Sequence, residues 1–147
     1  MPPDLRLHIQ DASNHDHLPC RRTLRRWVMA ALRKRAEVTL RFVGRAEGRR
    51  LNHQFRGKNY ATNVLTFTYS EHSPLLGDIV LCVPILKREA VERDIPLRRH
   101  CAHLVVHGTL HMQGYDHERD AQARVMEALE AKIMRNLGYP DPYLLST

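Results

Sequence analysis

The segment HGTLHMQGYDH, residues 107–117, contains three histidines whose spacing suits a metal ion. His107 and His111 are four residues apart, so on an α-helix both side chains lie on one face and can reach the same ion. Gly114 can adopt a positive φ and end the helix, which lets the chain turn back and bring His117 towards the other two. Three neutral imidazoles leave the fourth position of a tetrahedral zinc ion open. The segment therefore predicts a zinc site that activates water.

His103 forms a row with His107 and His111 on the same predicted helix. The outer two of these residues are about 12 Å apart along the helix axis, so all three cannot bind one ion. The turn at Gly114 favours the pair His107 and His111, and we expect His103 beside the site or at the surface. Nickel, cobalt or copper would also fit three histidines with an open position. The alternative is a row of ordinary core or surface histidines without metal.

Gly108 stands where the helical zinc-protease motif has a glutamate directly after its first histidine. Zinc lowers the pKa of a bound water to about 7, so hydroxide forms at neutral pH without a separate base. Gly108 therefore disfavours a metalloprotease, and we expect it to clear space beside the ion for a bulky substrate. Asp116 is expected either to fix the tautomer of a ligand imidazole or to cap the last helix.

The charge of the chain is concentrated in its N-terminal half. The net charge is +7, and residues 21–50 contain eleven Lys or Arg against two acidic residues, a net charge of +9. A one-sided basic surface is typical of a protein that binds a polyanion, and binding should weaken steeply with salt. The alternative is an ordinary solvated surface.

Composition predicts a cytoplasmic protein made of one domain. The 147 residues suffice for a single buried core, and no apolar run approaches the roughly 18–20 residues that span a bilayer. The first ten residues contain no cationic leader or apolar segment typical of export. Three cysteines without a C-x-x-C pair suit a reducing compartment, and we expect all three to be buried.

The order of the predicted elements indicates an α+β fold. We expect the last helix to bury Val125 among other apolar residues, the helix before the third strand to bury Ala46, Leu51 and Phe55, and the last strand to be buried on both faces. The tail 139–147 should be irregular. The periodicities predict strands at 5–9, 38–43, 61–69 and 75–83, and helices at 19–35, 45–56, 84–93, 96–114 and 118–137.

Three blocks of the sequence resemble the YbeY endoribonuclease family. HLVVHGTLHMQGYDH (103–117) is similar to the family signature HGxLHLxGYDH, with Met112 in place of leucine. LNHQFRGKNYATNVLTFTY (51–69) is similar to LNxxFRxxDxxTNVLSFPY, and LLGDIVLC (75–82) is similar to LGDIxIC. The blocks occur in the family's order and together span about residues 50–117.

The resemblance implies a small mixed sheet with helices packed about it, and a zinc-dependent, single-strand-specific endoribonuclease that matures the 3′ end of 16S rRNA and acts in ribosome quality control. It implies His107, His111 and His117 as zinc ligands and Arg56 as a catalytic residue near the metal. It also implies rRNA and the ribosome, or a small-subunit protein, as partners. A guanidinium suits phosphate oxygens and never deprotonates, which agrees with a role for Arg56 in sharing charge on the phosphate.

Three neighbours of Arg56 complete the expected site. Lys58 and Asn63 lie in the same strip and are candidates for RNA contacts. Asn59 stands where the family has aspartate, which puts in doubt a carboxylate role in anchoring the loop or balancing Arg56. Two other functions remain open: a non-catalytic RNA-binding assembly factor with a structural metal, and another metal-dependent hydrolase. We expect residues 1–147 to form the single metal-dependent endoribonuclease domain.

Overall fold

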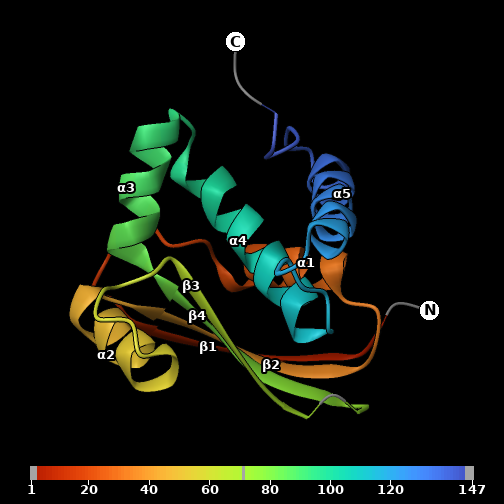
Figure 1. The fold of residues 1–147 in the computed structure, drawn as a ribbon, viewed down its shortest axis with the longest axis horizontal. Coiled ribbons are helices and arrows are strands. Elements are labelled where there is room, and N and C mark those ends of the chain that lie inside the picture. The colour runs from red at the N-terminus through yellow and green to blue at the C-terminus, as the bar shows by residue number, and fades with distance from the viewer. Residues whose placement is uncertain (1–2, 71, 145–147) are drawn as a thin grey trace.

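The structure is a computed structural model that describes residues 3–70 and 72–144. These residues form a mixed sheet with helices packed on both faces, so the predicted α+β fold is confirmed (Figure 1). The described elements are β1 (Leu5–Ala12), α1 (Arg21–Ala31), β2 (Ala36–Val43), α2 (Arg45–Arg56), β3 (Val64–Ser70), β4 (Leu75–Cys82), α3 (Val83–Arg93), α4 (Leu97–Met112) and α5 (Asp120–Asn136). Of the expected irregular tail, residues 145–147 lie outside the described residues.

The four strands are ordered β1-β2-β4-β3. β1, β2 and β4 are parallel, and the register pairs Leu7 with Val38 and Val38 with Gly77. Parallel neighbours need a crossover connection, which α1 provides between β1 and β2. β3 runs antiparallel to β4 and forms one edge of the sheet, with Phe67 opposite Asp78.

The sheet has two differently covered faces. In Figure 1, α1, α3, α4 and α5 lie above the sheet and α2 lies below it. Side chains alternate along β2 and β4, so Phe42 and Leu81 join the core above the sheet, whereas Val43 and Val80 join the smaller core under α2. β4 is therefore buried on both faces, as its continuous apolar sequence predicted.

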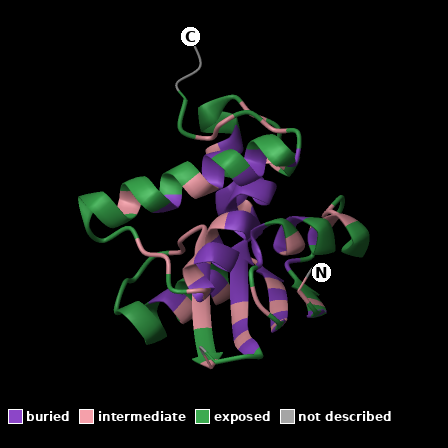
Figure 2. Cartoon of the chain, turned by 90° about the vertical axis from the view of Figure 1, so that its right-hand side faces the viewer, coloured by how far each residue is buried: buried purple, intermediate pink, exposed green. Residues whose placement is uncertain are grey.

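α4 is the central helix of the molecule. Eleven of its sixteen residues are buried, and Figure 2 shows the buried residues concentrated in the strands and the helix at the centre. Because α4 touches the sheet, α1, α3 and α5, it has almost no solvent face, which fits its mostly apolar sequence. No helix among the described residues is both long enough and apolar enough to cross a membrane.

Four side chains expected to be buried are exposed. Phe55 and Val125 are each 56% exposed, and Ala46 and Cys20 also face solvent. The physical reason is clear for α2, which approaches the sheet through its small residue Gly48. A Cβ on Gly48 would lie 3.0 Å from Cys82 Sγ. Phe55 lies one residue before the end of α2, and its ring meets the edge of Phe67 at a centroid distance of 4.8 Å.

Candidate metal centre

The C-terminal end of α4 and the turn after it bring three imidazole rings together. α4 ends at Met112, and Gly114 has φ +97°, the left-handed conformation expected from its place in the motif. Ring centroids are 6.4 Å apart for His107 and His111, 5.4 Å for His107 and His117, and 6.1 Å for His111 and His117. The turn therefore does place His117 against the two helical histidines.

Two of the three rings have one nitrogen already engaged. Nδ1 of His107 lies 2.5 Å from Glu130 Oε1, and Nδ1 of His111 lies 3.0 Å from the carbonyl oxygen of Tyr115. Both oxygens are acceptors, so each Nδ1 carries the proton and donates. The neutral tautomer then leaves the lone pair on Nε2, the arrangement that metal-binding histidines adopt. His107 and His111 thus fit a metal ion by their hydrogen bonds as well as by their spacing.

Asp116 is part of a close group of possible ligand atoms that includes His111 and His117 but not His107. One ligand atom each from His111, Asp116 and His117 lie within 4.8 Å of one another. Asp116 Oδ1 accepts a hydrogen bond from the backbone N–H of His117 (2.7 Å), and this bond is the main cause that holds the pKa of the carboxyl below its usual range. The N-cap of α5 is Arg119, so the alternative that Asp116 caps the last helix is wrong. Asp116 instead braces the turn and offers a further oxygen to a cation.

Glu130 is a site residue that was not predicted from the sequence. It lies on α5, is completely buried, and accepts a hydrogen bond from His107 Nδ1. Burial raises the pKa of Glu130, but its interactions with His103 and His107 outweigh burial and lower the pKa to about 2. A charged carboxylate therefore faces the ring of His107. The available signal was an acidic residue between Met126 and Ile133 on the apolar side of the last helix.

Two further histidines of α4 continue the line of polar side chains from His107 and Glu130 into the interior. His103 is buried, and its Nε2 lies 3.5 Å from Glu130 Oε1 without the geometry of a hydrogen bond. His100 is fully buried, with Nε2 2.8 Å from Glu89 Oε1, and burial lowers its pKa. Glu89 also accepts a hydrogen bond from Asn63 Nδ2 (3.0 Å). His103 thus lies beside the three rings. Asn63 is connected to His100 through Glu89, at the other end of this line of polar side chains.

The missing glutamate of the protease motif has a steric explanation. Gly108 is buried and faces the sheet, where an added Cβ would lie 2.9 Å from Ile79 Cγ2. A glutamate at this position would enter the core between α4 and β4. The expectation that Gly108 clears space for substrate is wrong, because its small size serves helix-to-sheet packing.

Arg56 is the last residue of α2 and is exposed. Among the described residues, no hydrogen bond or ion pair links Arg56 to another side chain. Lys58 is likewise exposed. Asn59 Oδ1 accepts a hydrogen bond from Arg49 Nε (2.9 Å), so an amide anchors this loop where the family has a carboxylate. The loop continues to Asn63 and its bond to Glu89, and so connects the α2 side of the sheet with the α4 side.

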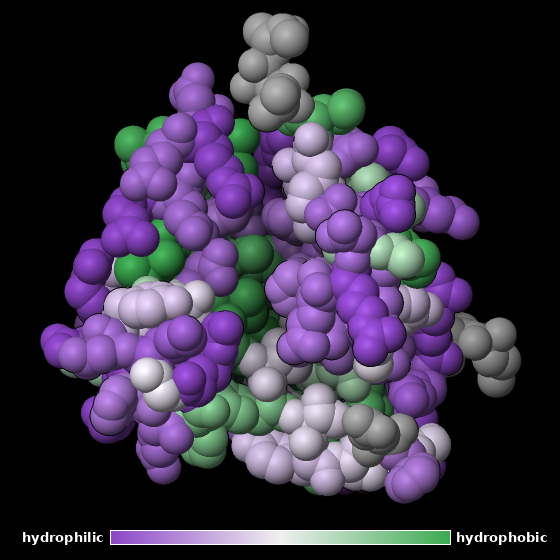
Figure 3. Space-filling view, viewed as in Figure 1, coloured by the Kyte–Doolittle hydropathy of each residue, from purple (hydrophilic) through white to green (hydrophobic). Residues whose placement is uncertain are grey.

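The basic segment 21–50 does not form a single surface. Its arginines on α1 and α2 lie on opposite faces of the sheet, and some have structural partners. Arg21 and Arg25 donate to the carbonyl oxygens of Leu7 (2.7 Å) and Leu5 (3.0 Å). Figure 3 shows the molecule with hydrophilic side chains on both sides of a narrow central hollow, where hydrophobic side chains gather. A polyanion would therefore meet positive charge on more than one side.

The geometry can be compared with known proteins. The family model for endoribonuclease YbeY matches residues 8–138. The chain belongs to the endoribonuclease YbeY family. Endoribonuclease YbeY of Aromatoleum aromaticum is 57% identical over 132 residues, which cover 90% of this chain and 86% of the relative. Endoribonuclease YbeY of Nitrosomonas eutropha is 56% identical over 137 residues, covering 93% and 97%.

A solved structure has a similar fold. The solution structure of TM1509 from Thermotoga maritima is 27% identical, with a TM-score of 0.61, and covers 88% of each chain. The family resemblance and the α+β fold predicted from the sequence are confirmed. The prediction of a nuclease-type hydrolase is confirmed through membership of the endoribonuclease YbeY family.

Proposed function

We propose that this chain is a single-strand-specific metallo-endoribonuclease of the cytoplasm that processes the 3′ end of 16S rRNA and acts in ribosome maturation and quality control. One domain, residues 1–147, carries the activity, with rRNA as substrate and the ribosome or a small-subunit protein as partner. The observation that supports this best is the convergence of His107, His111 and His117, whose helical members already have Nδ1 engaged.

The proposed metal is one zinc ion, held by these three histidines with a position left open for water or substrate. Such an ion supplies Lewis-acid chemistry at a phosphodiester and lowers the pKa of water. The chain contributes the orientation of the rings: the hydrogen bonds of His107 and His111 engage both Nδ1 atoms and leave both Nε2 atoms free to bind a metal. Asp116 braces the turn that carries His117.

The chain must also hold a polyanion in place. Arg56 would bind the phosphate and share the negative charge that grows as the phosphodiester is attacked, a contribution of a few kcal/mol. Exposed Lys58 follows it on the loop between α2 and β3. Asn63 contributes through the same loop, because its bond to Glu89 fixes the loop's far end.

A cleavage assay tests the activity. Metal-loaded protein, Arg56→Ala and His111→Ala are each incubated with single-stranded RNA and with casein. We expect RNA cleavage by the unmodified protein, a loss of about 100-fold or more in His111→Ala, a clear loss in Arg56→Ala, and no casein cleavage. Arg25→Ala is the matched control for Arg56→Ala, because the Arg25 guanidinium already binds the Leu5 carbonyl. RNA cleavage that survives both Arg56→Ala and His111→Ala would come from a contaminant and contradict the proposal.

Metal analysis tests the site separately. We expect about one zinc ion per chain in the purified protein and a clear loss in His117→Ala. Less than about one ion per three chains, unchanged by His117→Ala, would contradict the site.

A non-catalytic RNA-binding assembly factor is the second candidate function. The basic residues and a structural metal would suit it, but a structural zinc site is closed by four protein ligands. Asp116 is the one additional side chain grouped with His111 and His117 among the described residues. RNA binding without cleavage, in a protein that holds a full complement of metal, would favour this function. A protease or amide hydrolase is disfavoured because Gly108 has no room for the glutamate.

The rRNA assignment needs an experiment in cells. Sequencing the ends of 16S rRNA from cells that lack the protein should show unprocessed 3′ ends. Normal 16S ends, together with RNA cleavage by the purified enzyme, would leave the nuclease intact and assign it another RNA.

A further inference from the structure

Glu130 is the only buried acidic residue in the part of the chain that the structure describes. Placing a carboxylate in the interior is costly unless charged or hydrogen-bonding partners surround it. A residue with that cost and with a ring of the metal centre as partner needs an explanation beyond core packing. Its partners come from two elements distant in sequence: α4 and the segment after α5.

Both carboxylate oxygens of Glu130 are engaged. Oε1 accepts from His107 Nδ1 at 2.5 Å, and Oε2 accepts a hydrogen bond from the hydroxyl of Tyr143. His103 Nε2 lies 3.5 Å from Oε1 on the third side. Two hydrogen bonds to different oxygens fix the plane of the carboxylate, and so fix where Oε1 points. The direction of Oε1 in turn fixes the proton of His107 on Nδ1.

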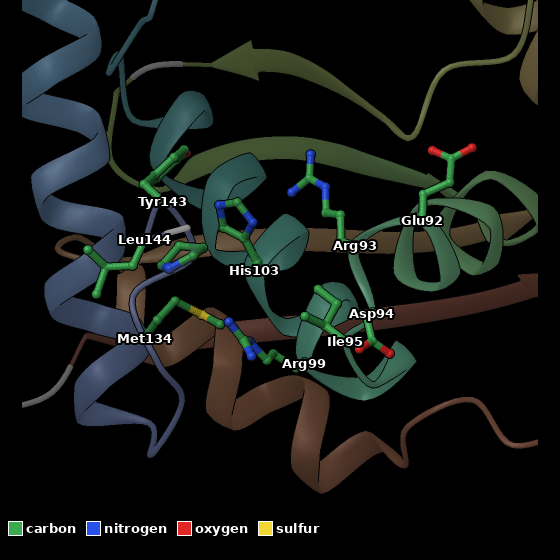
Figure 4. Close-up of a pocket in the computed structure, with 10 residues that line it drawn as sticks. Glu92, Arg93, Asp94, Ile95, Arg99, His103, Met134, Tyr143 and Leu144 are labelled. Carbon is green, nitrogen blue, oxygen red and sulfur yellow. The ribbon is translucent and has the colours of Figure 1, made fainter. Parts of the chain in front are cut away.

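Tyr143 is held in this place mainly by polar contacts. The residue is 42% exposed and lines a cavity of about 420 Å³ together with His103 and Met134. Figure 4 shows the tyrosine and the His103 ring side by side at this cavity. Their ring centroids are 5.4 Å apart, and the rings are perpendicular. Open space borders the phenol, and Tyr143 is held by its hydroxyl contact with Glu130, its edge contact with His103 and the hydrogen bond from its backbone N–H to Asp141 Oδ1 (2.8 Å).

We propose that Glu130 and Tyr143 are positioning residues for His107: Tyr143 orients the carboxylate, and the carboxylate holds the imidazole in the tautomer that presents Nε2 to the metal. This inference rests on the proposed metal centre. A carboxylate that accepts the outer N–H of a ligand histidine orients the ring and makes its other nitrogen a better ligand. The segment after α5 is then part of the metal centre, although Tyr143 follows His117, the last of the three proposed ligands, by 26 residues in the sequence.

The test compares two variants that keep the shape of the side chain. Glu130→Gln and Tyr143→Phe are measured against Glu127→Gln, an exposed position on the same helix, and Tyr139→Phe, a tyrosine just after α5. Zinc and cobalt dissociation constants are measured by competition with a chromophoric chelator. We expect zinc to bind about 10- to 100-fold more weakly to Glu130→Gln, about 10-fold more weakly to Tyr143→Phe, and unchanged to both controls.

A second readout reports the tautomer directly and needs no metal. In the metal-free protein at about pH 8, nitrogen chemical shifts of His107 should show the proton on Nδ1. The variants should show a mixture of the two tautomers. Tyr143→Phe keeps its ring at a partly exposed position, so it keeps the proposal testable if Glu130→Gln does not fold.

The outcomes separate this inference from the proposed function. Unmodified protein that binds no metal would overturn both. Unmodified protein that binds zinc, with unchanged affinity and unchanged His107 tautomer in Tyr143→Phe and Glu130→Gln, would overturn only the positioning role.

Discussion

The two faces of the sheet differ in how they hold their polar residues. Above the sheet, Glu130, His103 and His100 are buried and contact one another or the three clustered histidines. Below it, α2 rests on a small core, and its basic residues Arg45, Arg50 and Arg56 face solvent. Above the sheet the polar side chains are held in place by burial and mutual contacts, whereas below it the arginines present positive charge to solvent. Substitutions above should therefore act through stability and metal binding, and those of Arg45 and Arg50 below through graded electrostatics.

The largest difference is expected between two glycines that face the sheet from opposite sides. Gly108→Glu places a carboxylate against Ile79 and should prevent folding, since burying an unpaired charge costs several kcal/mol. Gly48→Ala meets chiefly the side chain of Cys82, and we expect a change within about 1 kcal/mol. Soluble yield and urea unfolding measure both. Equal soluble yield and equal stability of the two variants would show that the two faces of the sheet do not differ in this way.

Removing single histidines sharpens the comparison within the metal centre. His107→Ala leaves Oε1 of the buried Glu130 carboxylate without its hydrogen-bond donor and should lower the free energy of unfolding by about 3 kcal/mol. The side chain of His117 is 57% exposed, so His117→Ala should change it by less than about 0.5 kcal/mol. Urea unfolding with a chelator present separates these effects from metal binding. A similar loss in both variants would contradict the buried network.

His100 provides a pH test of the upper face. Burial lowers its folded pKa, so below the ordinary value of about 6.5 the unfolded chain binds more protons than the folded one. The stability is complete above that value and is lost as the pH falls towards the folded pKa. From about pH 7.5 to about pH 5.5, the metal-free protein should lose up to about 1 kcal/mol more than His100→Gln. An equal loss of stability in the metal-free protein and in His100→Gln would show that His100 does not stay neutral inside the fold.

The smallest effect is expected below the sheet. Arg50→Ala should reduce the slope of log affinity for single-stranded RNA against log salt by about 0.7, the value for one phosphate contact. Arg25→Ala is the control, because its guanidinium binds the Leu5 carbonyl. Filter binding over a range of salt concentrations measures the slope. An unchanged slope in Arg50→Ala would place the RNA away from α2.

The sequence was sufficient for features that depend on neighbours along the chain. The helical spacing of His107 and His111 and the left-handed Gly114 were predicted correctly, because each follows from local backbone geometry. Glu130 was missed because its meaning depends on a contact between α4 and α5. The role of Gly108 was misjudged for the same reason: only the packing on β4 shows that its missing side chain faces Ile79.

Tertiary structure also decides where the basic residues lie and which side chains of α2 are buried. The basic segment was predicted as one surface, but a sheet lies between α1 and α2. Phe55 has the spacing of a core residue, yet it lies one residue before the end of α2 and is exposed. Periodicity identifies a face of a helix, and the neighbouring element decides which part of that face is covered.

The order of Glu130 and Tyr143 in the chain has a consequence during protein synthesis. His107, His111 and His117 leave the ribosome before either residue, and Tyr143 follows the last histidine by 26 residues. At roughly 5–20 residues per second, the three histidines are synthesised seconds before the groups that contact Glu130 Oε1 and Oε2 are all present. The growing chain therefore contains the three-histidine motif some time before the completed fold can orient it.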